Sequence, residues 1–152
     1  MEPKKEGGDE MVRRIFFIAI WVLASVGLCI GQWGTPTNVN PVNSLSNELR
    51  PAISSDGNTL YLSSDRFGGS GSDDIWESAK SLGVWGAPAN LGHPINTASA
   101  DFLPSINWNG DELYFISDRP GALGLDIYWS QKVGGAWGTP VNLTAVNSAF
   151  TE

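Results

Sequence analysis

The chain has 152 residues and a formal net charge of −7. Beyond residue 31 the acidic side chains far outnumber the basic ones, and the basic ones form no patch. We therefore expect no binding to nucleic acid. The basic residues of that part are Arg50, Arg66, Lys80, Arg119 and Lys132. The 18 glycines and 9 prolines cluster between short apolar runs, a composition that predicts many short strands joined by turns.

The N-terminal segment has the layout of a secretory signal. Arg13 and Arg14 precede a continuous apolar run over residues 15–30 that ends in small residues. We therefore interpret residues 1–31 as a signal peptide, with Met11 as the expected start of translation. The run is shorter than the roughly 20 residues of a membrane span, but a retained anchor is the alternative, and it would be the chain's only contact with a membrane.

Cys29, the only cysteine, lies inside that segment. If the segment is removed, the mature chain contains no cysteine. Disulfides, thiolate metal sites and cysteine nucleophiles are then all excluded.

A block of about 50 residues is written twice. Its first copy reads R-P-A-I-S-S-D-G-N-T-L-Y-L-S-S-D-R from Arg50, and its second reads L-P-S-I-N-W-N-G-D-E-L-Y-F-I-S-D-R from Leu103. The copies continue with D-I-W-E-S and D-I-Y-W-S, respectively. Self-similarity at such a period predicts a repeat architecture.

Each copy predicts four strands. In the first copy these are residues 52–54, 60–64, 75–79 and 85–91, with Asp56-Gly57 as hairpin turn. The second-copy equivalents are 105–107, 113–117, 127–131 and 137–143. The last strand carries a W-G-x-P-x-N element that also occurs, a third time, at residues 33–39.

Four antiparallel strands per unit of this length describe a blade of a β-propeller. The sequence thus predicts an all-β chain with two blades, residues 48–99 and 100–148. Residues 32–47 are expected as an extra outer strand of a preceding or closing blade, and residues 149–152 as the start of a truncated third blade.

The repeat resembles the TolB-like or WD-like β-propeller repeats of bacterial envelope proteins. The resemblance rests on P-x-[IL]-S-x-D-G-x-x-L-Y-[FL]-x-S-D-R, followed by D-I-[WY]-x-S, and on the W-G-x-P-x-N-L ending. This ending is typical of the version found ahead of OmpA-like domains, although no OmpA-like domain is present. The resemblance implies a ring of about six blades, so we expect a fragment of a longer protein. Assembly of the ring from several short chains, a homo-oligomer, is the alternative.

The first copy contains a candidate calcium site. Residues 68–76, G-G-S-G-S-D-D-I-W, match the calcium-binding nonapeptide, with Asp73 and Asp74 as ligands. The second copy lacks this pattern. We therefore favour a glycine-rich loop without a metal, and expect no cofactor.

Residues that recur in both copies are interpreted as structural. Asp65-Arg66 and Asp118-Arg119 suit turn capping and ion pairing between neighbouring blades better than a substrate clamp. The tryptophans of the W-G elements, which we expect to pack blade against blade, are Trp33, Trp85 and Trp137.

Aromatic residues that break the repeat are the candidate ligand-binding residues. Trp108 replaces Ser55, Trp129 replaces Glu77, and Phe67 stands opposite Pro120. An exposed aromatic ring can stack on a sugar or anchor a protein partner.

The sequence offers no catalytic constellation. His93 is the only histidine, and no serine or carboxylate pair is placed to work with it. We expect a periplasmic or secreted, non-catalytic module for protein or glycan binding or scaffolding in the bacterial cell envelope. The alternatives are the propeller portion of a secreted peptidase or glycosidase, and a lectin that assembles from short chains.

Overall fold

The computed structural model describes residues 33–148. The chain divides into a unit that ends at Thr37 and a unit that begins at Asn38, and both repeats belong to the second unit. The expected signal peptide, including Met11 and Cys29, and the expected start of a third blade lie outside the described residues. Within residues 33–148 no helix is long and apolar enough to cross a membrane.

The first repeat folds into one antiparallel sheet. Its strands are β1 (Glu48–Ile53), β2 (Thr59–Ser64), β3 (Asp74–Ser81), β4 (Val84–Trp85) and β5 (Ala89–Asn90). The order is β1-β2-β3, and the two short strands β4 and β5 both pair with β3. This sheet, blade 1, has the meander of a propeller blade.

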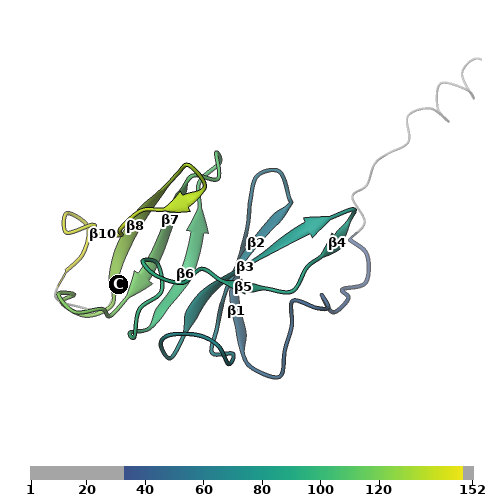
Figure 1. Cartoon of the computed structure of the whole chain (residues 1–152), viewed down its shortest axis with the longest axis horizontal. Coiled ribbons are helices and arrows are strands. Elements are labelled where there is room, and N and C mark those ends of the chain that lie inside the picture. The colour runs from purple at the N-terminus through teal and green to yellow at the C-terminus, as the bar shows by residue number, and fades with distance from the viewer. Residues whose placement is uncertain (1–32, 149–152) are drawn as a thin grey trace, which may run out of the picture. The chain divides into compact units, whose positions relative to one another are not determined.

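The second repeat forms an equivalent sheet, blade 2 (Figure 1). Its strands are β6 (Asp101–Ile106), β7 (Glu112–Ser117), β8 (Asp126–Val133), β9 (Ala136–Trp137) and β10 (Val141–Asn142). The pairing repeats that of blade 1, with β9 and β10 both on β8. The all-β propeller-blade architecture expected from the sequence is thus the observed one.

Three details differ from the expected strands. The first strand of each blade begins earlier, at Glu48 or Asp101, and tolerates a proline because its register shifts there. The W-G-x-P-x-N element forms two short strands instead of one, because its proline cannot donate a ladder hydrogen bond. The first copy of this element, residues 33–39, contains no strand, and Trp33 is 96% exposed.

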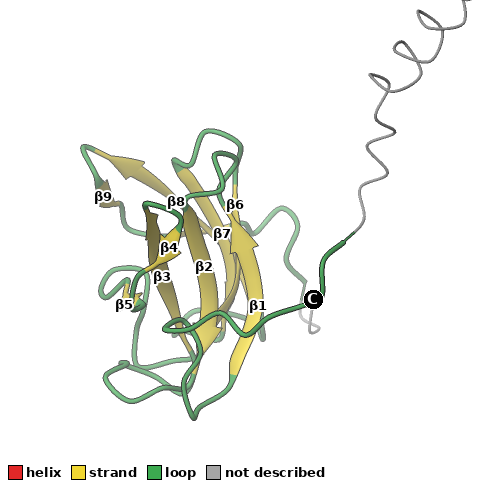
Figure 2. Cartoon of the chain, turned by 90° about the vertical axis from the view of Figure 1, so that its right-hand side faces the viewer, coloured by secondary structure: helices red, strands yellow, loops and turns green. Residues whose placement is uncertain are grey.

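The two sheets pack face to face (Figure 2). Leu113, Phe115 and Tyr128 of blade 2 enclose Ile75 of β3 and Ile95 of the linker between the blades. Ile75 and Ile95 are both completely buried. The core therefore lies between the blades, so that each blade is stabilised by its neighbour.

A buried asparagine fixes the linker to blade 1. The Asn96 side-chain oxygen accepts a hydrogen bond from the Ile75 N–H at 2.9 Å, and its amide donates to the Ile75 carbonyl at 2.8 Å. The same amide also donates to Asn90 Oδ1. Asn147 makes the equivalent contacts with Ile127 in blade 2. In each blade the asparagine side chain thus makes the hydrogen bonds that a neighbouring strand would otherwise make with the outer edge of β3 or β8.

Replacing Asn96 with alanine should lower the free energy of unfolding by about 2 to 4 kcal/mol, because the Ile75 N–H would stay buried without an acceptor. The Ile75 carbonyl would lose one of its two donors and keep the Leu91 N–H. Asn43, the equivalent residue ahead of blade 1, is exposed, so Asn43→Ala serves as the matched control with a change near zero. Urea unfolding of both variants measures the difference. Equal losses would contradict this role for Asn96.

Candidate functional site

The recurring arginines hold each blade to the linker that precedes it. Arg119 Nη2 lies 2.6 Å from Asp101 Oδ1 and donates to the Ile95 carbonyl at 2.7 Å, while its Nε donates to Ser117 Oγ. The guanidinium also stacks on the ring of Tyr128, 4.7 Å from its centroid. A guanidinium with its donors engaged in this way is a structural clamp.

Arg66 repeats these contacts in blade 1. Its Nη2 donates to the Val42 carbonyl and to Glu48 Oε1, at 2.8 and 2.9 Å, and its guanidinium lies over Trp76. Both ion pairs join residues of one blade, Arg66 with Glu48 and Arg119 with Asp101, whereas the repeat pattern predicted pairing between neighbouring blades.

The aspartates before these arginines fix the start of the first strand. Asp65 accepts hydrogen bonds from the Asn47 backbone N–H and side-chain amide, at 2.9 and 3.0 Å, which lower the pKa of its carboxyl. Asp118 accepts from the Ala100 N–H in the same way. These contacts are those of turn caps, the role that the repeat predicted for both aspartates.

The glycine-rich loop of blade 1 closes on its own aspartate. Buried Asp74 accepts hydrogen bonds from the backbone N–H groups of Ser70 and Gly71 and from the Asn90 side chain. A Cβ on Gly71 would lie 1.9 Å from the Ser99 carbonyl oxygen, which explains a glycine at that position. These contacts account for the nonapeptide pattern through loop packing.

The calcium ligands expected from the pattern are not gathered into a site. Asp73 is half-buried, and its carbonyl accepts the Asp101 N–H. No group of three or more His, Cys, Asp or Glu residues able to hold a metal occurs among residues 33–148. The loop instead binds blade 2 through its backbone.

The candidate aromatics lie in three separate places. Trp108, at the β6–β7 turn, is 80% exposed. Phe67 is fully exposed in the β2–β3 loop, at the opposite end of the strands. Trp129 lies on β8, half-buried on the face of blade 2 that points away from blade 1, with its indole N–H buried and lacking an acceptor among the described residues. The structure therefore does not combine them into one site.

Trp85 and Trp137 are packed, each beneath the ammonium of a lysine. Trp137 meets Tyr61 of blade 1 edge-on at 6.4 Å between centroids, and Lys132 lies over its ring. Trp85 packs in the cluster of Val42, Leu62 and Trp76, with Lys80 over its ring. Trp137 thus joins the two blades.

A polar cleft of about 300 Å³ opens beside Trp108, between the first turns of the two blades. Hydroxyl, amide, carboxylate and ammonium groups line it, and they come from both blades, so neither repeat forms the cleft alone. The lining residues are Ser54, Ser55, Asp56, Thr59, Tyr61, Asn109, Gly110 and Lys132.

Hydrogen bonds position the walls of this cleft. The Ser55 hydroxyl donates to the Trp108 carbonyl at 2.6 Å, which ties the exposed tryptophan to the turn of blade 1. Asp56 accepts hydrogen bonds from the Ser54 hydroxyl and from Asn58, and these lower the pKa of its carboxyl. The Asp56 carboxylate is therefore ionised at neutral pH.

Tyr61 forms the inner wall. Burial, with the nearby charges of Glu77 and Asp56, raises the pKa of its phenol to about 12, so it stays a neutral hydroxyl. With the Lys132 ammonium and the Asp56 carboxylate, the cleft offers hydrogen-bond donors and acceptors to a polar ligand. Sequence reasoning singled out Trp108 but missed the cleft, because residues of two repeats form it.

His93 lines a second hollow, of about 260 Å³, with Glu77, Asn90 and Lys132. The residues that line it include no serine, so this part of the described structure brings no hydroxyl nucleophile to His93. The hollow has no arrangement that resembles a catalytic triad.

The comparisons with known proteins support the fold. A solved structure assigned to TolB, from Agrobacterium tumefaciens, matches 78% of this chain with a TM-score of 0.51 at 22% sequence identity. The match covers 36% of that structure, so the chain spans about a third of its length. No family model matches the sequence, and the search of curated proteins gives no significant match. The chain thus has a TolB-like propeller fold.

Acid should weaken the Arg66 clamp. Burial raises the pKa of Glu48, but hydrogen bonds from Ser44 and the Arg66 charge outweigh it, so the net pKa falls below its ordinary value of 4.5. The folded state then holds the proton less tightly than the unfolded state. The stabilisation is present above about pH 4.5 and is lost as the pH falls through the lowered pKa.

We expect Glu48→Gln to be less stable than the wild type at pH 7, with the difference shrinking as the pH falls through the lowered pKa of Glu48. Urea unfolding at pH 7 and at a series of lower pH values measures it. Glu77→Gln is the control, since the Glu77 side chain makes no hydrogen bond or ion pair with residues 33–148. A difference that does not change with pH would show that the Glu48 charge plays no part.

Replacing Asp74 with alanine should cost about 2 to 3 kcal/mol of stability, because the loop N–H groups of Ser70 and Gly71 lose their acceptor. Asp73→Ala, the adjacent control, should cost much less. If packing alone holds the loop, calcium and EDTA leave the melting temperature of the wild type unchanged. A rise with calcium that Asp74→Ala abolishes would instead establish an ion site.

Proposed function

We propose that the chain is a non-catalytic, exported module that binds glycans of the bacterial cell envelope through the cleft beside Trp108. The observation that carries the proposal is an exposed tryptophan, Trp108, directly before Asn109 in the wall of a cleft that hydroxyl, carboxylate and ammonium groups line. Its carbonyl is bonded to Ser55, a second residue of that wall. An indole ring offers a flat apolar surface to the face of a sugar, while the polar groups suit its hydroxyls.

The rigidity of the blades supports this role. The Ser55 hydroxyl of blade 1 holds the backbone of Trp108, and Lys132 lies over the Trp137 ring. Groups that are already held in place lose less entropy when a ligand binds. Because residues of both blades line the cleft, it exists only while the blades are in contact.

The location follows from the N-terminal segment. A signal peptide over residues 1–31 would deliver the blades to the periplasm or the exterior, where envelope glycans and proteins are the available partners. The TolB-like fold is compatible with this location. An envelope protein that docks on Trp108 is the alternative partner, and titration with oligosaccharides distinguishes the two.

Replacing Trp108 with alanine should weaken binding to a panel of envelope oligosaccharides by about tenfold or more, since the stacking surface is lost. Tyr61→Phe, which removes only the cleft hydroxyl, should weaken it less. Titration calorimetry measures both, with Phe67→Ala at the opposite end of the strands as a control without effect.

If the wild type binds none of the oligosaccharides, the glycan proposal is wrong. A second outcome would also contradict it. If the wild type binds the oligosaccharides, and binding is weakened by Phe67→Ala but not by Trp108→Ala, the ligand site lies at the other end of the blades.

A further inference from the structure

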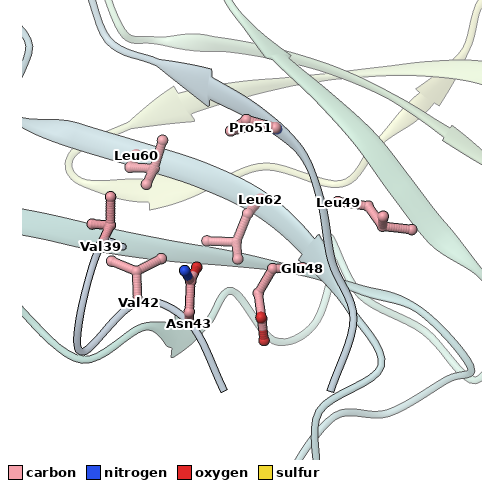
Figure 3. A pocket seen from close by; sticks show the side chains of 8 residues that line it. All are labelled: Val39, Val42, Asn43, Glu48, Leu49, Pro51, Leu60 and Leu62. Atoms are coloured by element: carbon pink, nitrogen blue, oxygen red, sulfur yellow. The ribbon is translucent and has the colours of Figure 1, made fainter. Parts of the chain in front are cut away.

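Blade 1 has an apolar pocket on the face that points away from blade 2 (Figure 3). Its volume is about 180 Å³, and Leu60 and Leu62 of β2, Val42 of the preceding segment and Leu49 of β1 line it with four further residues. Leu49 is 49% exposed. Val42 covers Leu62 on this face, and the side chain of Leu49 is left half-exposed beside them.

The repeat shows what such a pocket receives. By alignment Leu60, Leu62 and Val42 correspond to Leu113, Phe115 and Ile95, and in blade 2 these three enclose Ile75 of the neighbouring β3. The pocket of blade 1 is therefore the equivalent of the surface that buries Ile75 completely.

Blade 2 presents the matching partner on its outer face. Alternation along β7 and β8 points Tyr114, Ile116, Ile127 and Trp129 away from blade 1, because Phe115 and Tyr128 point toward it. Ile127 is the equivalent of Ile75, and all four residues are only half-buried. In blade 1 the positions equivalent to Ile116 and Trp129 are Ser63 and Glu77, and they lie on the face that contacts blade 2. The outer face of blade 2 is therefore more apolar than that face of blade 1.

We propose that a second copy of the chain docks head to tail, with its Ile127 in the pocket of blade 1. The occupant follows from the interface that the molecule already contains, because both of its halves recur here, on the two faces that do not lie between the blades. Since the two faces differ, the contact is heterologous and can repeat from copy to copy. The proposal does not depend on glycan binding.

Docking requires an exchange of two segments. In the incoming copy, Asn147 already accepts a hydrogen bond from the Ile127 N–H at 2.8 Å and donates one to the Ile127 carbonyl at 3.0 Å. After docking, Asn43 of the receiving copy would make these same two hydrogen bonds. Asn43 lines the pocket and makes no side-chain hydrogen bond with described residues. One asparagine must replace the other.

Burial decides which segment leaves. Val42, next to Asn43, is 3% exposed and packed on Leu62, whereas Val146, next to Asn147, is 59% exposed. The segment around Asn147 therefore yields, and Asn43 takes over its bonds to Ile127. The hydrogen bonds to Ile127 are conserved in number, while burial of Ile127 and Leu49 favours docking.

Sedimentation velocity of the full chain over a range of concentrations tests the docking. We expect association that Leu49→Asp and Asn43→Ala weaken by about tenfold. Asn147→Ala should leave it equal or stronger, because Asn147 has to leave. Leu82→Asp, on a fully exposed turn residue, is the matched control. The N-terminal segment is the same in every variant, so it cannot cause the differences.

A cross-link tests the register independently of these variants. Within the chain, the Leu103 N–H donates to Ser63 Oγ at 2.9 Å, so the head-to-tail contact brings Arg50 of one copy to Ile116 of the other. In a Cys29→Ser background, a mixture of Arg50→Cys and Ile116→Cys chains should form a disulfide-linked dimer. A monomer at all concentrations, or association without this cross-link, would overturn the proposal.

Discussion

The hydrogen bonds between Asn96 and the backbone of Ile75 are the interaction on which the rest of the structure depends. A side-chain amide has the donor and acceptor of a peptide group, and here it satisfies the outer edge of β3 with the linker that leads to blade 2. Because of these bonds, Ile95 next to Asn96 lies in the core between the sheets. One residue thus sets the position of the second blade against the first.

The clamps of Arg66 and Arg119 add to this constraint from the other side of the linker. Each arginine binds a linker carbonyl and a carboxylate at the start of its own first strand. These groups are largely removed from water, so their pairing offsets a desolvation cost that an isolated charge would not recover. The residues that recur most faithfully therefore serve the blade contacts, and the residues available for a ligand are those that differ.

The sequence predicted the blades well because strands and turns are local. The apolar and aromatic runs that begin at Leu60 and Leu113, after the turn residues Asp56-Gly57 and Asn109-Gly110, located the second strand of each blade closely. It missed the early start of β1 and β6, since Pro51 and Pro104 indicate an end where the strand instead bulges. It also missed the cleft beside Trp108, whose walls come from turns 53 residues apart in the chain. Asn43, Asn96 and Asn147 recur in the sequence at equivalent positions, but an asparagine in a linker usually indicates a turn, so their bridging role is seen only in the structure.

Through the Asn96 linker and the core it completes, the two blades form one folding unit. Native-state hydrogen exchange of the amides of Ile75 in blade 1 and Phe115 in blade 2 measures this directly. We predict the same free energy of opening for both amides, and an equal decrease of both in Asn96→Ala. Independent values, or a decrease confined to Ile75, would show that the blades unfold separately and would contradict a single folding unit.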